Sequence, residues 1–477
     1  MSTTVTEMSI DNDSSSSSSL ISLSRLPDGH RLPSLPTNAL SEFGKTLQNS
    51  IDIEITKMQE ESIASDELRD MIFRQTRTVF KNSTQILFLI KTGRGLDDSN
   101  NSLFDENRSI IASLLIATQS DVLSREGRLN HAIERFTEVR LLKHFFENGT
   151  ICGPALLDNP DDEVFIGAML GFAQELSRYV IGRACDNDVN SIYLCKAIVN
   201  QIQGKMLEFD LRNGNLRRKY DGLKYVVKSI ETVLYELSLL DDDNDGSVSP
   251  TKKRRTTDNY DDLILIPIND INMIKERMDI YDKLREEVIK TSRDVQKLSK
   301  QAIFSVHRGN LTDCRNKIDQ SRVIAKGILE KIVTHPTLRQ GAVSNSLEEW
   351  AEALLTLVWV ENKKICLKEE MEIVNSNEYI GALSDFTGEI GRIAVSIASS
   401  RAIEPIKAIL EVDLTISASL MILNITGKYS KKVDAVNNNL KKVEDIVYEL
   451  SLLLRGGRAP KPKDEMPSEG ADDKDNE

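Results

Sequence analysis

The strongest constraint on the fold of this 477-residue chain is an internal repeat. Residues 228–240 read KSIETVLYELSLL and residues 441–453 read KKVEDIVYELSLL, with eight of thirteen positions identical. Two further matches lie at nearly the same spacing, Phe165-Ile-Gly-Ala168 with Tyr379-Ile-Gly-Ala382 and Glu175/Arg178 with Glu389/Arg392. The offset is 214 residues in mid-chain and 213 near the end. Chance similarity between two amphipathic helices would not keep this spacing, so the pattern predicts two tandem copies of one domain.

Both copies are expected to be helical. Apolar residues recur at three- and four-residue steps, with one gap of seven, at Ile274, Met278, Tyr281, Leu284, Val288, Val295 and Leu298. Such a stripe is typical of an amphipathic helix. No proline lies between residues 36 and 154, which permits long helices, and aromatic residues make up only 5% of the chain. Because alternating β-branched runs and hairpin turns are scarce, the sequence predicts an all-α protein.

Composition divides the chain into five segments. A Ser-rich tail (1–36), a charged linker (241–262) and an acidic Pro-containing tail (455–477) hold too few apolar groups to fold. The predicted domains are residues 37–240 and 263–454. Residues 1–40, 241–262 and 459–477 carry net charges of −2, −3 and −4, which is nine of the thirteen net negative charges. The remaining chain is only mildly acidic, so its overall charge does not exclude a nucleic-acid partner.

Cysteine spacing and hydropathy indicate the cellular setting. Five widely separated cysteines without a CxxC motif predict free thiols in a reducing compartment. No run approaches eighteen uncharged apolar residues, and the first forty residues lack a secretory signal, so we expect no membrane span. We expect a location in the cytoplasm and nucleus. The basic run 252–255 in the linker fits a nuclear import signal, a nonspecific phosphate-binding patch or a run without function.

Four acidic residues in the second copy have a spacing that suits a metal site. Glu349 and Glu352 are three residues apart, and Asp385 and Glu389 are four apart, so each pair shares one helix face. Two such helices side by side would offer four carboxylates, the hard oxygen ligands that Mg²⁺ prefers. Acidic pairs at this spacing are also common on solvated faces. Apolar residues 353–360 follow the first pair, which favours a buried helix whose carboxylates need partners.

The first copy provides an internal comparison for these four positions. Subtracting 214 places Arg135, Glu138, Gly171 and Glu175 there. A cation replaces one predicted ligand, and glycine removes another. Because an arginine would repel the metal ion, we expect the first copy to be catalytically inert.

A basic, tyrosine-containing segment in the first copy is a candidate nucleic-acid surface. It contains Arg217, Arg218, Lys219, Lys224 and Lys228, with Tyr220 and Tyr225 between them. Cations that pair with phosphates and rings that stack on bases are what single-strand binding requires. The alternative interpretation is a solvated helix face with its tyrosines in the core.

These segments resemble the translin family. Residues 216–237 (LRRKYDGLKYVVKSIETVLYEL) and 173–178 (AQELSR) resemble translin, whereas residues 292–308, 347–353 and 379–389 resemble TRAX, the translin-associated factor X branch. The resemblance implies roughly seven helices in each copy, single-stranded nucleic-acid binding and metal-dependent endoribonuclease activity. It places Glu349, Glu352 and Asp385 on the TRAX catalytic acids and Glu389 on another acidic position of that motif. The two branches are separate subunits in the family but share one chain here.

The function expected from the sequence is a Mg²⁺-dependent endoribonuclease with catalysis in the second copy and RNA handling mainly in the first. The resemblance suggests small-RNA passenger-strand fragments or tRNA-derived pieces as substrates, and single-stranded DNA as a further ligand. A non-catalytic single-strand-binding protein and a helical scaffold for protein partners are the alternatives. Hollow octameric shells in the family suggest a homo-oligomer, or an assembly with translin-family subunits. Four chains would supply eight domains, so we expect a tetramer.

Overall fold

The computed structural model describes residues 41–93, 101–118, 127–243, 260, 263–423 and 428–456, and these ranges contain helices and no strand. The all-α prediction is confirmed. Each copy contributes six α-helices within the described residues, where the resemblance implied about seven. The first copy comprises α1 (Glu42–Lys91), α2 (Asn101–Ala117), α3 (Arg128–Asn148), α4 (Asp162–Cys185), α5 (Val189–Met206) and α6 (Asn215–Asp243).

The second copy repeats this order of elements. Its helices are α7 (Ile268–His307), α8 (Leu311–Lys331), α9 (Ala342–Asn362), α10 (Ser376–Ala398), α11 (Ile403–Ile422) and α12 (Lys428–Gly456). A short 3₁₀ turn before the fourth helix also recurs, as η3 (Pro154–Leu157) and η6 (Lys368–Glu370), and a further turn, η5 (Pro336–Arg339), precedes α9. The duplication read from the sequence is therefore visible element by element.

Local signals fix the ends of the two helices that carry the acidic residues. The Asn375 side chain accepts a hydrogen bond from the Glu378 backbone N–H, and the Glu378 carboxylate accepts one from the Asn375 N–H. This capping box starts α10 in a defined register. Helix α9 begins after Gly341, whose φ of +73° suits glycine, and ends at Lys363 in the left-handed region.

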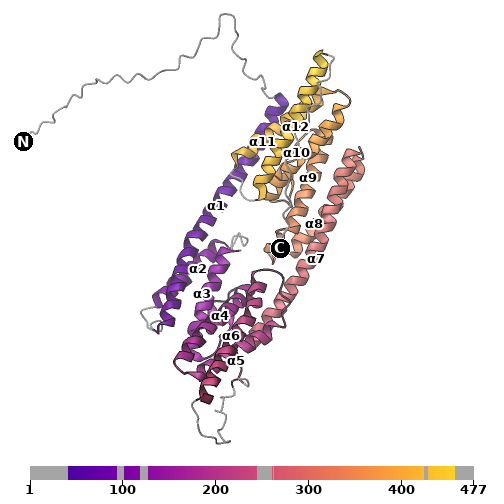
Figure 1. The fold of residues 1–477 in the computed structure, drawn as a ribbon. Helices are drawn as coiled ribbons and strands as arrows, with labels where there is room; N and C mark the ends of the chain where they lie inside the picture. The colour runs from indigo at the N-terminus through magenta and orange to yellow at the C-terminus, as the bar shows by residue number, and fades with distance from the viewer. Residues whose placement is uncertain are drawn as a thin grey trace, which may run out of the picture.

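The first helix of each copy passes from one bundle to the other. Figure 1 shows α1 and α7 along opposite sides of the molecule, each spanning both bundles. The first half of α1 buries Leu47, Ile51, Ile55 and Met58 in the core of the second copy. In return, Leu265, Ile266, Ile271 and Ile274 are buried in the core of the first copy. Each core is therefore completed by apolar residues from the other copy.

Polar contacts accompany both crossovers. The Ser41 hydroxyl donates to Glu411 at 2.6 Å, and Lys368 pairs with Glu61 at 3.2 Å. On the other side, Arg277 donates two hydrogen bonds to Asp162, at 2.6 and 2.8 Å. The predicted boundaries at residues 37 and 263 thus separate the copies in sequence but not the two cores in space. The basic run 252–255, the predicted N-terminal tail and residues 457–477 of the predicted C-terminal tail lie outside the described residues, whereas Arg455 and Gly456 end α12.

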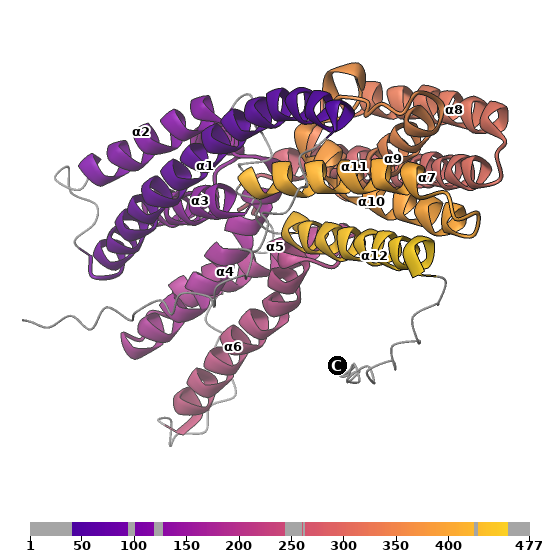
Figure 2. The same cartoon turned by 90° about the horizontal axis from the view of Figure 1, so that it is seen from above.

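The remaining helices form pairs that diverge from the body. Seen from above, the α4–α6 and α10–α12 pairs point apart (Figure 2). Helix α4 has the length and hydropathy of a membrane span, but 72% of its most apolar window is buried inside the protein, as in the core helix of a bundle. The five cysteines are free, as predicted, and all except Cys185 are buried.

Candidate metal centre and nucleic-acid surface

The fold brings the four predicted acidic residues together in the second copy. Helices α9 and α10 pack against each other. Glu349 and Glu352 lie on α9, and Asp385 and Glu389 lie on α10. The charges of Asp385, Glu389 and Glu349 all act on Glu352, which places the four carboxylates around one point.

Glu352 is the central member of this acidic cluster, defined as Glu349, Glu352, Asp385 and Glu389. Its side chain is only 8% exposed, and among the described residues its carboxylate makes no hydrogen bond or ion pair. Burial, followed by repulsion from Asp385, Glu389 and Glu349, raises the pKa of Glu352 to about 8. A buried carboxylate without a partner is costly, so this position favours a bound cation.

The outer three carboxylates pair with cations from α7, α10 and α12. Asp385 pairs with Lys432 at 2.6 Å. Glu349 lies 3.3 Å from the Lys300 ammonium. Neither lysine is among the site residues predicted from the sequence.

Glu389 lies between two further groups. It contacts His307 Nε2 at 2.6 Å and Arg392 at 2.8 Å. His307 is the last residue of α7, so the second half of that helix forms one wall of the cluster.

The donor set fits a hard divalent cation by its chemistry and not by preformed geometry. In the part of the chain that the structure describes, no three acidic, histidine or cysteine side chains are arranged to hold a metal ion. Asp385 and Glu389 point to lysine, histidine and arginine partners instead. Their carboxylate oxygens are hard donors of the kind that Mg²⁺ prefers. Binding an ion would require Asp385 and Glu389 to exchange their present partners.

At the equivalent place in the first copy, basic side chains pair with the carboxylates. Arg135 donates to Glu138 at 2.5 Å and lies 3.9 Å from Glu175. Lys91, the last residue of α1, also pairs with Glu175, at 2.5 Å. Gly171 provides no carboxylate, and a Cβ atom there would lie 2.8 Å from a Glu138 oxygen. Arg135 therefore neutralises, in the first copy, the carboxylates at the place equivalent to the acidic cluster.

A lysine–glutamate–glycine contact recurs in both copies beside this place. In the first copy, Lys219 pairs with Glu134 and lies 3.4 Å from the Gly167 carbonyl oxygen. In the second, Lys432 pairs with Glu348 at 2.7 Å and lies 3.5 Å from the equivalent carbonyl oxygen of residue 381. A side chain at either glycine would collide with its glutamate. The 213- and 214-residue offsets link these residues, so the repeat itself was the signal for finding them.

The basic surface predicted on α6 is present, with one member placed elsewhere. Arg218, Lys224 and Lys228 are exposed and make no ion pair within the described ranges. Arg217 is partly exposed and pairs with Asp221 at 3.1 Å. Lys219 instead directs its ammonium to Glu134 inside the bundle, so it does not belong to the proposed surface.

Two tyrosines behave differently on this face. Tyr225 is 66% exposed, and the Lys224 ammonium lies 5.0 Å from the centre of its ring. Tyr220 packs partly against the core. Given 3.6 residues per turn, Arg218, Tyr225 and Lys228 share one side of α6. An exposed ring between cations has the composition of a single-strand-binding surface.

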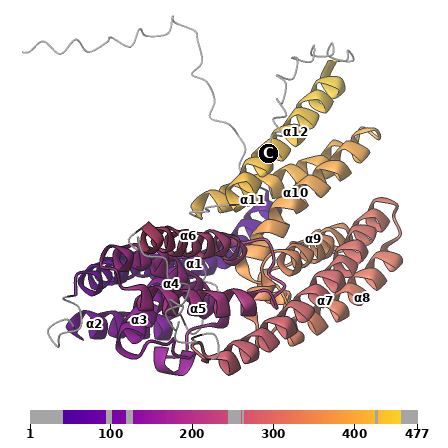
Figure 3. The ribbon, with the colours of Figure 1, turned by 60° about the horizontal axis from the view of Figure 1, so that its bottom comes forward.

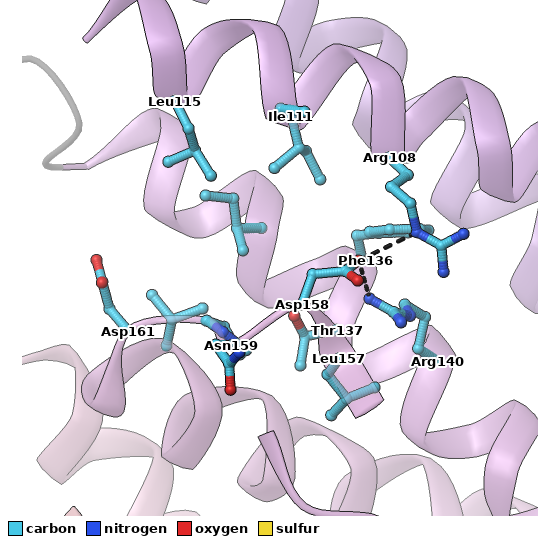
Figure 4. Close-up of a pocket in the computed structure, with 14 residues that line it drawn as sticks. Arg108, Ile111, Leu115, Phe136, Thr137, Arg140, Leu157, Asp158, Asn159 and Asp161 are labelled. Atoms are coloured by element: carbon cyan, nitrogen blue, oxygen red, sulfur yellow. Dashed lines mark hydrogen bonds and ion pairs between the residues drawn. The ribbon is translucent and has the colours of Figure 1, made fainter. Parts of the chain in front are cut away.

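A separate pocket of about 300 Å³ lies between α2, α3 and the start of α4. Figure 4 shows its apolar side chains, including Ile111, Leu115 and Phe136, and two arginines at its edge. Arg108 and Arg140 both pair with Asp158, at 3.1 and 2.7 Å. The first of these pairs recurs in the second copy as Arg322 and Glu372 at 3.0 Å. The charges at this edge therefore belong to the repeated fold, and the pocket contains none of the predicted site residues.

The fold and the site define a class of protein: a tandem pair of helical bundles with four clustered carboxylates in one copy and an arginine among the equivalent residues of the other. The model of the Translin family matches residues 67–240 and 283–455. The chain belongs to this family. It combines two such domains as a fusion of the translin and TRAX type. Both matched segments begin inside a crossover helix, α1 or α7.

Individual relatives cover smaller parts of the chain. Translin of Gallus gallus is 34% identical over 79 residues, which is 17% of this chain and 34% of that protein. The chain therefore spans about a third of the translins that it matches. The translin-associated protein X homolog of Schizosaccharomyces pombe is 23% identical over 190 residues, 36% of this chain and 81% of that protein. The solved structure of apo-NeC3PO has a TM-score of 0.36 and 22% identity, covering 38% of this chain and 97% of that one.

Proposed function

We propose that this protein is a Mg²⁺-dependent endoribonuclease that binds single-stranded RNA. The acidic cluster of the second copy would cleave the strand, and the basic face of α6 would bind it. The observation that carries the proposal is the buried, unpaired Glu352 among three further carboxylates, at a position whose counterpart in the first copy is neutralised by Arg135. One copy of the repeat is thus left open to a cation and the other is closed.

Each residue of the cluster has a role in this proposal. Glu349, Glu352, Asp385 and Glu389 would hold the ion. A Mg²⁺ ion bound there would supply Lewis-acid stabilisation of the phosphate and acidify a water molecule. Lys432 holds Asp385 against α12, and His307 and Arg392 hold Glu389, so these three side chains set the positions of two of the outer ligands. Water adds to phosphorus as the bond to the leaving oxygen breaks, and that oxygen takes up a proton.

The substrates and location extend this proposal. Family resemblance supports small-RNA passenger strands or tRNA fragments as substrates, with single-stranded DNA as a ligand. We also propose that the protein acts in the cytoplasm and nucleus, which microscopy of the tagged full chain would test.

Cleavage assays test the proposal. Labelled single-stranded RNA should be cut in Mg²⁺ and remain intact in EDTA. Asp385→Asn should abolish cleavage while RNA binding, measured by filter retention, stays near wild type, because the basic face of α6 is untouched. Asp434→Asn is the matched control, since Asp434 is exposed on α12 and makes no ion pair within the described chain. Full activity of Asp385→Asn would overturn the site assignment. Binding without any cleavage would favour the non-catalytic alternative.

An oligomer of even chain number is part of the same proposal. Large apolar side chains are exposed at equivalent positions of the two copies, in the pairs Leu207/Met421 and Tyr235/Tyr448, and three residues before the end of the first helix of each copy, at Phe88 and Phe304. Two related sets of exposed apolar residues on one chain favour a closed, symmetric assembly. We propose a tetramer of the chain, with translin-family subunits as alternative partners. A stable monomer at micromolar concentration in light scattering would contradict it.

A further inference from the structure

A cleft of about 350 Å³ opens beside the acidic cluster, between α10 and α12. Figure 3 shows these two helices side by side at one end of the molecule. Glu389, a member of the cluster, forms part of the cleft wall, so the cleft adjoins the proposed catalytic centre. Its volume lies within the range of about 300–1,000 Å³ that is usual for ligand sites.

Two glycines open this space. Gly388 and Gly391 face α12 from α10. A Cβ atom at Gly388 would lie 3.4 Å from the Asn439 amide nitrogen, which is a tight contact. A Cβ atom at Gly391 would lie 4.0 Å from Val443, an ordinary contact. A side chain at Gly391 therefore fits the fold while it narrows the cleft.

The polar groups of the cleft suit a phosphodiester. Lys442 is exposed on α12 and makes no ion pair among the described residues. Arg392 is 70% exposed and, among the residues that the structure describes, pairs only with Glu389, so most of its guanidinium donors remain available. Asn439 donates its amide to Thr387 at 3.0 Å. Two cations with donors to spare next to the acidic cluster are suited to a phosphate oxygen.

The first copy has an equivalent of Arg392, Arg178, which pairs with Glu175 at 3.0 Å, but it lacks the two glycines, the asparagine and the lysine of the cleft. Gln174 and Ser177 stand in place of the two glycines, and Val226 and Ser229 in place of Asn439 and Lys442. The Gln174 amide lies 3.6 Å from where a Cβ atom of Gly222 on α6 would be, so its side chain extends toward that helix. The glycines and Lys442 therefore occur only in the copy with the open acidic cluster.

We propose that this cleft binds a nucleotide of the RNA strand next to the phosphate that is cleaved. Lys442 and Arg392 hold its phosphate, and the space above Gly388 and Gly391 accepts the sugar. The apolar side chain of Val395 borders that space. The inference deepens the proposed function and rests on it, because it assigns the cleft to the same substrate strand.

Three variants of the full chain test the cleft: Lys442→Gln, Gly391→Ser and the control Lys441→Gln. Lys441 is the exposed neighbour of Lys442 but does not line the cleft. For cleavage of a labelled oligouridine, Lys442→Gln should raise KM about fivefold with little change in kcat. Gly391→Ser should also raise KM. Lys441→Gln should match wild type.

RNA binding measured in the Asp385→Asn background distinguishes the loss of a charge in Lys442→Gln from the loss of space in Gly391→Ser. Lys442→Gln should reduce the slope of log affinity against log salt by about 0.7, the value for one single-strand phosphate contact. Gly391→Ser should weaken binding without changing the slope, because it removes no charge.

The outcomes distinguish the two proposals. If wild type cleaves RNA but Lys442→Gln and Gly391→Ser behave like Lys441→Gln, the cleft assignment is wrong and the proposed function stands. If RNA is bound with the expected response to Lys442→Gln but is never cleaved, the catalytic proposal fails and the cleft remains a nucleotide site. If the wild-type chain binds no oligouridine, both are overturned.

Discussion

Replacing Asp413 by asparagine should stabilise the second bundle, by an amount that depends on pH. Asp413 lies on α11, is fully buried, and neither carboxylate oxygen has a hydrogen-bond partner among the described residues. Burial raises the pKa of this carboxyl from its usual value of 3.8 to about 8. The folded chain must therefore keep a proton that the unfolded chain loses at neutral pH.

The size of the effect follows from this difference in pKa. Between about pH 4 and pH 8 the folded state binds one more proton than the unfolded state, so the free energy of unfolding falls as pH rises. Each pH unit in that window costs about 1.4 kcal/mol. At pH 7 the penalty is about 4 kcal/mol. Asparagine has nearly the same shape and cannot ionise, so it removes the pH-dependent penalty, although its amide also lacks a partner.

Urea unfolding followed by circular dichroism, at several pH values from 4 to 8, measures this prediction. The stability of Asp413→Asn relative to wild type should rise by about 1.4 kcal/mol per pH unit between about pH 4 and pH 8. Asp319→Asn is the matched control, because Asp319 is exposed on α8 and makes no ion pair in the described part of the chain. A pH-independent difference, or a variant that loses relative stability as pH rises, would refute the reasoning.

Three further changes test the site. Glu349→Arg should abolish the rise in melting temperature that Mg²⁺ produces, and it should raise the melting temperature of the metal-free chain, because it places an arginine where the first copy has Arg135. A Mg²⁺-dependent rise in melting temperature that persists in a thermal shift assay would contradict this. Gly171→Asp alone should leave an Asp385→Asn chain inactive in RNA cleavage, since the new Cβ atom would crowd Glu138; any gain of activity would contradict this. Lys224→Gln should reduce the slope of log affinity for RNA against log salt by about 0.7, the value for one phosphate contact, in filter-binding assays. An unchanged slope and an unchanged affinity would show that Lys224 lies on a solvated helix face that does not contact RNA.

Much of the fold could be predicted because each copy of the repeat can be compared with the other, position by position. The nearly constant offset of 213–214 residues predicts the duplication, and it identifies Arg135 and Gly171 as departures from the acidic cluster. Helical periodicity then placed Glu349 with Glu352 on one face. These conclusions depend only on the spacing of residues along the chain, which can be read from the sequence.

The crossover of α1 and α7 could not be predicted in the same way. The apolar stripe Leu47, Ile51, Ile55 and Met58 shows that this face of α1 is buried, but periodicity does not indicate which bundle buries it. The prediction that Lys219 belongs to the basic surface of α6 is wrong for a related reason. Helical spacing put it among exposed cations, whereas its partner Glu134 lies 85 residues away in sequence. Its recurrence with Lys432 was the available signal.

Metal binding by two matched variants tests the central claim most directly, that a cation site exists in the second copy alone. Mn²⁺ can replace Mg²⁺ as a paramagnetic probe, and its binding can be followed by electron paramagnetic resonance on the full chain. Glu352→Gln should lose the bound Mn²⁺ signal, whereas Glu138→Gln, the same change at the equivalent position of the first copy, should keep it. Equal binding by the two variants, or no binding by wild type, would contradict the account.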